Sequence, residues 1–390
     1  MLNRRILRVK AMQYLYAYEQ CKRANFEVAL DLIAERFLPD LNSMIPQDLN
    51  LLNQEKQVAQ ELFRKQYEEE RPIFTDTTIS NKIREAARSG INYYHQQNKK
   101  DLDRLRIEML SAAEGVFVRY LKVMKLLVQL ADFVDYEYNE WRKKPFHSIV
   151  VMQHELKFHK NVVIMQMRNH AKLQEHFKNK GVKWDEDVVR QCYKVMVKDE
   201  QYQTYKNLPA TTPEQEYEIV NYLLREFILK NDVVLTVFEE EDISWTENKS
   251  VIKSMTTKTL KALQESGIAA ELSELAVNWD DDREFFKDLF IATVKEQKTV
   301  EPFIAAKTKN WEIDRITLID RIILNMALAE MMTFPSIPVK VSINEYIELS
   351  KNYSTPKSRV FVNGLLNTIS EEMLKAAYIR KSGRGLLDNK

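Results

Sequence analysis

The sequence predicts an all-α protein with long helices. Apolar residues recur at three- and four-residue spacing over much of the chain, which is the periodicity of amphipathic helices. Only 7 glycines and 10 prolines occur in 390 residues, so few positions interrupt a helix. Hydrophobic residues make up 45% of the chain and charged residues 29%, as in ordinary globular proteins. At ~100–200 residues per domain, this length allows about two to three domains.

Overall composition excludes several classes of protein. The formal net charge is +1, so a nucleic-acid site would have to be a local basic patch. Two cysteines, Cys21 and Cys192, are too few for a disulfide framework or a zinc cluster. The sequence has no apolar run of about 18 residues and no signal-peptide pattern. We therefore expect a cytoplasmic protein without a membrane-spanning helix.

The chain begins with a basic amphipathic helix, expected over residues 4–22. The first 23 residues contain six basic side chains against one acidic side chain. Basic side chains at a helix N-terminus oppose the helix dipole, which favours an anion-binding role. A solvated first turn explains the same charges equally well. A second helix is expected over residues 26–37, ending before Pro39.

The middle of the chain is helical in pattern without a recognisable chemical motif. A stripe of apolar residues over 102–141 favours one long helix with a packing role. All six histidines lie between His95 and His176. At ~100° per residue, His154 and His159 would point ~140° apart on a helix, so they do not form the usual zinc motif. We expect no metal and no cofactor.

Three closely spaced helices are predicted near the C-terminus. Thr317 and Asp320 form a capping pattern that opens the first, in which Asp320 begins the wetter face. This helix ends before Pro335. Ser342 and Glu345 form a capping box that is expected to open the second helix.

The third of these helices is expected to have Thr355 at its N-cap position and Pro356 at its first position. Gly364 then falls inside the helix, where glycine costs about 0.5–1 kcal/mol relative to alanine. Close approach of a second backbone would offset this cost.

Three short motifs follow one another in this region: the pair Asp320–Arg321, the segment 338–345 (PVKVSINE) and the segment 361–364 (FVNG). In this order and spacing they resemble the NusB family of transcription antitermination factors. The N-terminal helix adds to the resemblance, because the family begins with an arginine-rich segment that runs into an Ala-x-Gln-x-Leu-Tyr helix. The matching residues here are Arg4, Arg5, Arg8, Ala11, Gln13, Leu15 and Tyr16.

The resemblance implies two small helical bundles, with a long helical insertion in the N-terminal half. We expect residues 1–40 to begin the N-terminal bundle and residues 41–210 to form the insertion. The expected remainder of that bundle with its linker covers 211–310, the C-terminal bundle covers 311–379, and 380–390 form a flexible basic tail.

The resemblance also implies a function. Members of the family bind boxA-type single-stranded RNA together with NusE, a protein of the small ribosomal subunit. They act in the RNA polymerase antitermination complex on ribosomal RNA operons. By this resemblance, Asp320 and Glu330 are candidate contacts to NusE. The candidate RNA-binding residues are Arg4, Arg5, Arg8, Gln13, Tyr16, Lys357, Ser358 and Phe361.

Each candidate also has a simpler structural explanation. Phe361 repeats at helical spacing with Leu365 and Ile369, which is typical of a core residue. Asp320 and Glu330 could be a capping and a solvated carboxylate. The sequence shows no nucleophile elbow, phosphate loop or glycine-rich methyl-donor motif, so we expect no enzyme. This argues against a ribosomal RNA methyltransferase of related fold, and leaves a helical protein-interaction scaffold with a weak or lost RNA site as the alternative.

Overall fold

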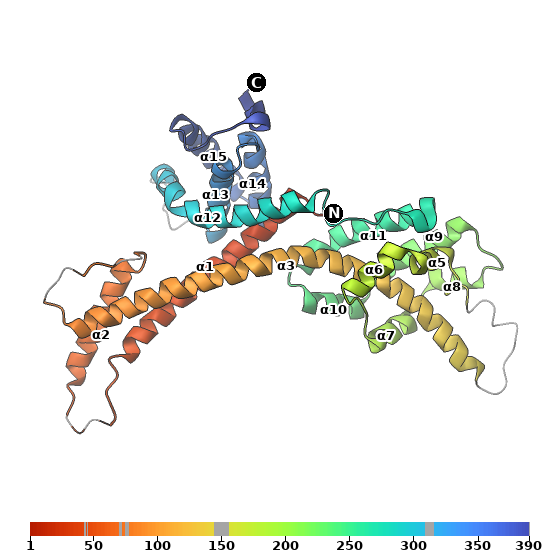
Figure 1. The fold of residues 1–390 in the computed structure, drawn as a ribbon, viewed down its shortest axis with the longest axis horizontal. Coiled ribbons are helices and arrows are strands. Elements are labelled where there is room, and N and C mark those ends of the chain that lie inside the picture. The colour runs from red at the N-terminus through yellow and green to blue at the C-terminus, as the bar shows by residue number, and fades with distance from the viewer. Residues whose placement is uncertain are drawn as a thin grey trace. The chain divides into compact units, whose positions relative to one another are not determined.

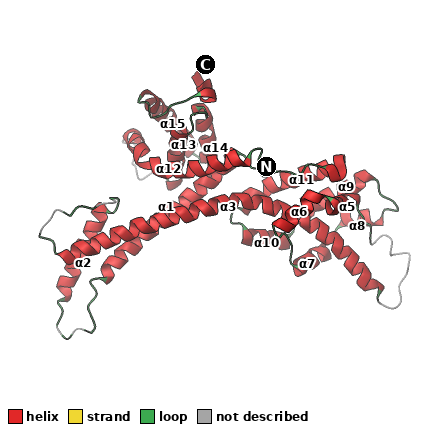
Figure 2. Ribbon diagram, in the orientation of Figure 1, coloured by secondary structure: helices red, strands yellow, loops and turns green. Residues whose placement is uncertain are grey.

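A computed structural model describes the chain except residues 43, 45, 70–71, 75–77, 144–155, 309–315 and 390. Every regular element in the described part is helical, which confirms the predicted all-α class (Figure 2). None of the described helices is both long and apolar enough to cross a membrane. The helices group into two compact units (Figure 1): a first unit of Met1–Asn3 and Ser111–Asp282, and a second unit of Arg4–Leu110 and Arg283–Lys390.

This division joins residues 4–110 to the C-terminal region. The domain boundaries expected at residues 40, 210 and 310 stay predictions.

The N-terminal half of the second unit is a three-helix arm. It contains α1 (Arg4–Glu35), α2 (Leu49–Gln66) and the part of α3 (Asn81–Arg142) that ends at Leu110. Its core includes Ile33, Phe63 and Tyr94, and a β-carbon on Gly90 would lie 2.6 Å from Cδ1 of Ile33. The absence of a side chain at Gly90 leaves room for the Ile33 side chain in this core.

The structure corrects the prediction of two helices before Pro39, because α1 is continuous. The segment between the expected helices contains no glycine or proline. Asn25 lies within it, and its amide nitrogen donates to Oδ1 of Asn98 and to Oδ2 of Asp101 on α3, both at 2.8 Å. Since this buried amide is satisfied across the helix interface, it does not compete for the backbone and end the helix.

The C-terminal half of the second unit is a helical bundle built around α13 (Leu318–Thr333). Every residue of α13 from Ile322 to Met331 is buried, and the helix packs against α1, α14 (Val339–Tyr353) and α15 (Ser358–Lys375). Helix α12 (Trp279–Thr308) precedes this bundle. A helix that is apolar on all sides is the expected centre of a bundle.

Capping was predicted correctly for one of the three C-terminal helices. Thr317 is the N-cap of α13 and its hydroxyl accepts from the amide of Asp320 at 3.1 Å. By contrast, α14 begins after Pro338 and α15 begins after Lys357. Ser342 lies inside α14, where its hydroxyl donates to Glu330 of α13 instead of capping a helix.

The flexible basic tail expected over 380–390 stays a prediction, and the described part of it has regular structure. Residues Gly383–Asn389 form a 3₁₀ helix, η6. The amide of Ser382 donates to the carbonyl of Pro335 at 3.0 Å, and Nζ of Lys381 donates to the carbonyl of Phe334 at 3.0 Å. The tail is thereby attached to the turn between α13 and α14.

The first unit surrounds the second half of α3 with shorter helices. These are α5 (Val162–Asn169), α6 (Ala171–Asn179), α7 (Glu186–Met196), α8 (Glu200–Asn207), α9 (Pro213–Tyr222), α10 (Asp232–Glu241) and α11 (Trp245–Ser266). A π turn, η2 (Leu223–Phe227), and a 3₁₀ turn, η3 (Ile228–Lys230), continue α9. The long helix predicted over 102–141 lies within α3, which spans 62 residues. In the core, the rings of Phe238 and Trp245 stack with centroids 4.3 Å apart.

We predict that Gly385→Ala detaches the tail. A β-carbon at this position would lie 2.0 Å from the carbonyl oxygen of Pro335, and that backbone atom cannot move aside as a flexible side chain could. Hydrogen exchange at the amides of Ser382 and Gly385 should become fast, while the free energy of global unfolding changes by less than about 1 kcal/mol. Arg384→Ala, at an exposed neighbouring position, is the control. Unchanged protection of both amides would contradict the tail's attachment.

Candidate nucleic-acid and partner site

Arg8, a candidate RNA contact, is buried against Glu330, a candidate partner contact. Nε and Nη2 of the guanidinium donate to the two carboxylate oxygens at 2.7 and 2.8 Å, and the side chains are 4% and 0% exposed. Ser342 and Tyr346 of α14 donate to the same carboxylate at 2.7 and 2.9 Å. The pair therefore joins α1, α13 and α14. In this conformation neither charge is accessible to a ligand, and Glu330 is not the solvated carboxylate of the simpler explanation.

In this network the guanidinium of Arg8 stays charged, and the hydroxyl of Tyr346 stays protonated and neutral. Burial alone would lower the pKa of Arg8, but the hydrogen bonds and the charge of Glu330 raise that pKa above its usual value. Burial, with the nearby Glu330 carboxylate, raises the pKa of Tyr346 well above its usual value. Tyr346 therefore stays protonated and donates to Glu330.

Arg5 is the more exposed arginine at the start of α1. Its side chain is 55% exposed, and its Nε and Nη2 donate to the carboxylate of Glu345 at 2.9 and 2.8 Å. Glu345 therefore pairs with α1 and does not complete a capping box. A phosphate that binds Arg5 would compete with this carboxylate. The guanidinium carbon of Arg4 lies 4.7 Å from the centroid of the Phe285 ring.

A small apolar hollow contains the two other candidates on α1. Gln13 and Tyr16 line it, together with Met12, Ile319, Ile322 and Tyr353, and its volume is about 220 Å³. Tyr16 is 42% exposed. Two tyrosines at one hollow offer flat faces on which nucleic-acid bases stack. Tyr353, the last residue of α14, lines the hollow although the sequence pattern did not single it out. The signal that could have found it is an aromatic residue two positions after Lys351.

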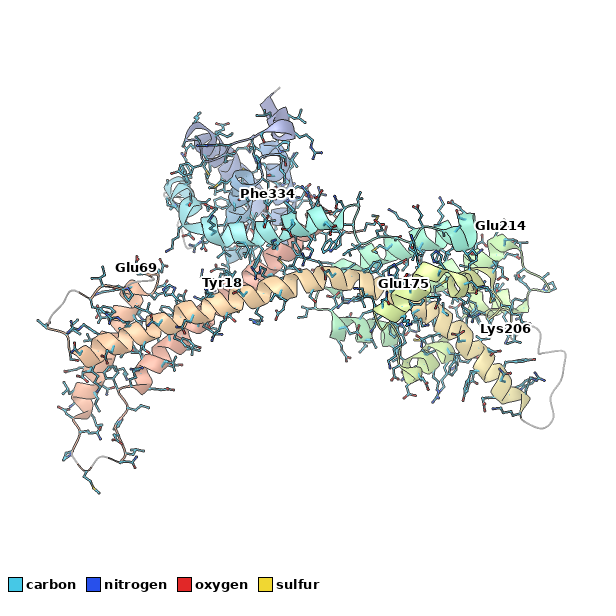
Figure 3. All side chains as sticks on the ribbon, viewed as in Figure 1. Tyr18, Glu69, Glu175, Lys206, Glu214 and Phe334 are labelled. Carbon is cyan, nitrogen blue, oxygen red and sulfur yellow. The ribbon has the colours of Figure 1, made fainter. Side chains whose placement is uncertain are left out.

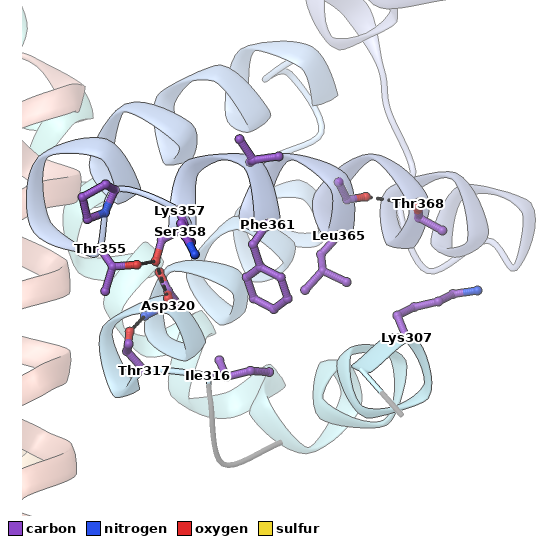
Figure 4. Close-up of a pocket in the computed structure, with 13 residues that line it drawn as sticks. Lys307, Ile316, Thr317, Asp320, Thr355, Lys357, Ser358, Phe361, Leu365 and Thr368 are labelled. Carbon is purple, nitrogen blue, oxygen red and sulfur yellow. Dashed lines mark hydrogen bonds between the residues drawn. The ribbon is translucent and has the colours of Figure 1, made fainter. Parts of the chain in front are cut away.

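A larger groove of about 970 Å³ lies between α12, the start of α13 and α15. Figure 4 shows Phe361 and Leu365 on α15 facing into it, with Ile316 before α13 and Lys307 on α12. Phe361 is only half-buried, because the core face of α15 is formed by Val362, Leu366, Ile369 and Met373. The alternative that Phe361 is a core residue is therefore wrong.

A chain of hydroxyl groups links the inner wall of this groove. Oγ of Ser358 donates to Oδ2 of Asp320 at 2.7 Å, and lies 2.9 and 2.8 Å from the hydroxyls of Ser354 and Thr355. Asp320 is 3% exposed, so it does not begin a wet helix face as expected. Asp320 lies in the first turn of α13 and accepts a hydrogen bond from Ser358 of α15, and these two features explain its burial. Oδ1 of Asp320 has no hydrogen-bond partner among the described residues.

Gly364 lies exposed on the wall of the same groove. A β-carbon at this position would meet no atom within 4 Å, so no second backbone among the described residues approaches it, contrary to expectation. The helix therefore carries the cost of a mid-helix glycine without a packing reason in the part of the chain that the structure describes.

The structure thus divides the candidates into four sets, of which Arg4 and Arg5, against Phe285 and Glu345, form the first. Lys357, Ser358, Phe361 and Asp320 line the larger groove, and Gln13 and Tyr16 line the smaller hollow. Arg8 and Glu330 lie inside the bundle. Among the described residues there is no cluster of three or more histidine, cysteine, aspartate or glutamate side chains that could hold a metal ion. His154 lies outside the described residues.

These features define a helical binding protein with two open hollows on one bundle. The NusB family profile matches residues 246–371. The transcription antitermination protein NusB of Salinibacter ruber is 40% identical over 136 residues, which cover 33% of this chain and 85% of that protein. The chain belongs to the NusB family.

Other relatives match shorter or more divergent segments. The NusB protein of Chloroherpeton thalassium is 39% identical over 106 residues, covering 27% of this chain and 50% of the relative. The NusB protein of Bacillus cereus is 32% identical over 122 residues, covering 30% of this chain and 94% of the relative. No solved structure matches the chain. Residues 1–245 lie outside the family profile.

We predict that Glu330→Gln or Arg8→Met destabilises the second unit by about 3–5 kcal/mol, because each leaves a buried charge without its partner. The double variant Arg8→Met with Glu330→Leu should cost less than the sum of the single effects. Urea unfolding followed by circular dichroism measures both. A loss of less than about 1 kcal/mol in each single variant would contradict the role of the pair.

Proposed function

We propose that this chain is a transcription antitermination factor that binds boxA-type single-stranded RNA together with NusE and supports transcription of ribosomal RNA operons. The relatives named above are transcription antitermination proteins, and the chain shares their family. We infer a cytoplasmic factor that acts by binding rather than by catalysis, within an RNA polymerase antitermination complex.

One observation carries the RNA part of the proposal: Gln13, Tyr16 and Tyr353 line one hollow although they come from opposite ends of the chain. Tyrosine faces stack bases, and the glutamine amide can donate to or accept from base edges. Arg5 on α1 and the exposed Lys357 at the start of α15 would contact phosphates. Each phosphate neutralised on a single strand adds ~0.7 to the salt dependence of binding.

The larger groove supports the partner part of the proposal. Its lining is mostly apolar, with Phe361 and Leu365 as its main side chains. An apolar groove on a helical bundle suits a protein segment better than a phosphate backbone. We therefore propose that NusE occupies this groove near Asp320 and that Phe361 contacts NusE, with Lys357 and Ser358 at the edge nearest the RNA.

We predict that Tyr16→Ala weakens binding to a short boxA-type RNA about tenfold or more, because stacking on one aromatic side chain contributes about 1–3 kcal/mol per base. Tyr136→Ala removes a tyrosine of similar exposure, 50% against 42%, and should leave binding unchanged. Fluorescence anisotropy with the boxA-type RNA and a scrambled RNA measures both.

Selective binding to the boxA-type RNA that is lost in Tyr16→Ala would support the proposal. Equal and weak binding to both RNAs would favour the scaffold alternative. Unchanged selective binding in Tyr16→Ala would overturn the assignment of the hollow.

We predict that Gly364→Leu stabilises the chain by about 0.5–1 kcal/mol and weakens NusE binding about tenfold. The stability gain follows from helix propensity and open space around the glycine. The binding loss follows from a side chain projecting into the groove. Calorimetry with purified NusE measures affinity, and urea unfolding measures stability. Asn363→Leu, at the exposed neighbouring position outside the groove lining, is the control. Full NusE affinity in the Gly364 variant would contradict the proposed occupant.

A further inference from the structure

A lysine cluster lies in the first unit, well separated in sequence from the candidates above. Helix α6 and the turn that follows it carry Lys172, Lys178, Lys180 and Lys183. Glu175, labelled in Figure 3, is the single acidic residue between 171 and 184, and Asp185, Glu186 and Asp187 follow directly at the start of α7. All four lysines are exposed. Lys125 of α3 completes the cluster, since its Nζ lies 5.0 Å from the centroid of the Phe177 ring.

Contacts inside the first unit fix this cluster against α3. The indole nitrogen of Trp184 donates to the carbonyl of Lys122 at 2.7 Å, and its backbone amide donates to Oε1 of Gln129 at 3.0 Å. The ring of His176 lies edge-on to Phe117, with centroids 5.3 Å apart. The turn therefore presents its lysines from a fixed backbone, with a partly exposed aromatic pair beside them.

The lysines of this cluster differ from other lysines of the same unit in their partners. The side chains of Lys172, Lys178, Lys180 and Lys183 form no hydrogen bond or ion pair within the described part of the protein. Other lysines of the same unit do have acidic partners. Lys230 and Lys253 both approach Glu226, at 2.5 and 3.9 Å, and Lys261 approaches Glu265 at 3.6 Å.

We propose that the lysine cluster binds the phosphate backbone of single-stranded RNA, as a second RNA contact in addition to the hollow of the second unit. This inference rests on the proposed RNA-binding function and extends it to a region outside the family profile. Single strands are bound by basic groups that follow the phosphates and by aromatic faces that stack bases. The cluster offers both, with Phe117 and His176 as the aromatic pair.

Two other polyanionic partners fit less well. A membrane surface requires exposed apolar side chains next to the basic ones. Among the described residues no large apolar side chain is exposed between Met165 and Val195. An acidic protein would also bury apolar area at the centre of its contact, and the same lack of apolar side chains disfavours it.

The test compares two triple variants of the full chain. Lys178, Lys180 and Lys183 are replaced by glutamine in the test variant. Lys230, Lys253 and Lys261, which already have acidic partners, are replaced by glutamine in the control variant. Binding is measured by fluorescence anisotropy at several salt concentrations, with a boxA-type RNA of about 12 nucleotides and with the same RNA extended to about 40 nucleotides, the longer one being able to occupy more than one site.

We expect the test variant to bind the longer RNA about tenfold more weakly, with the slope of log affinity against log salt reduced by about 2, because three phosphate contacts at ~0.7 each are lost. Its binding to the shorter RNA should match that of the natural chain. The control variant should match the natural chain for both RNAs.

Equal affinity and equal salt slope of the test and control variants on the longer RNA would overturn this inference. So would binding of the natural chain to vesicles of phosphatidylglycerol that is lost only in the test variant, because the cluster would then serve a membrane. The Tyr16→Ala variant separates this inference from the proposed function. If it binds the short RNA normally while the lysine variant loses the long RNA, the hollow is wrongly assigned and the cluster stands.

Discussion

The buried ion pair of Arg8 and Glu330 is the constraint on which the second unit depends. It joins the first helix of the chain to the central helix of the C-terminal bundle, and two hydroxyls of α14 complete the hydrogen bonding of the carboxylate. Burying two charges is expensive unless every polar atom is satisfied, so the pair fixes one register of α1 against α13. The same register places Gln13 and Tyr16 next to Tyr353 at the hollow. An arginine that holds the helix in place thus positions the side chains proposed to bind RNA.

The sequence was sufficient to predict the helical class and the central helix, because periodicity and the Thr317 cap are local signals. It was insufficient for Glu330, which stands alone in an apolar stripe and pairs with a residue 322 positions away. The Ser342 and Glu345 pattern failed for the same reason: both side chains can cap a helix, and both found distant partners instead. Local patterns predict how a residue could be used, whereas tertiary contacts decide between competing uses of the same hydroxyl or carboxylate.

Two glycines show how packing and binding requirements can be separated. Gly385 has a backbone oxygen where its side chain would be, so the fold itself requires it. Gly364 has open space, yet it occupies a helix interior in which alanine would be more stable. A glycine that lowers helix propensity and has no packing reason among the described residues leaves room for another backbone to approach the helix there. Its place on the groove wall is consistent with a protein partner in contact with α15.

Charge distribution extends the argument to the region outside the family profile. The chain is nearly neutral, with 58 basic and 57 acidic residues, so a long-range attraction to RNA cannot come from net charge. Affinity for a polyanion must then come from places where cations lack acidic partners. Arg5 has a partner in Glu345 that a phosphate would have to displace, whereas the lysines of the α6 turn have none among the described residues. A phosphate that binds the turn displaces no acidic partner among the described residues, so RNA contact at these lysines would break no ion pair of the first unit.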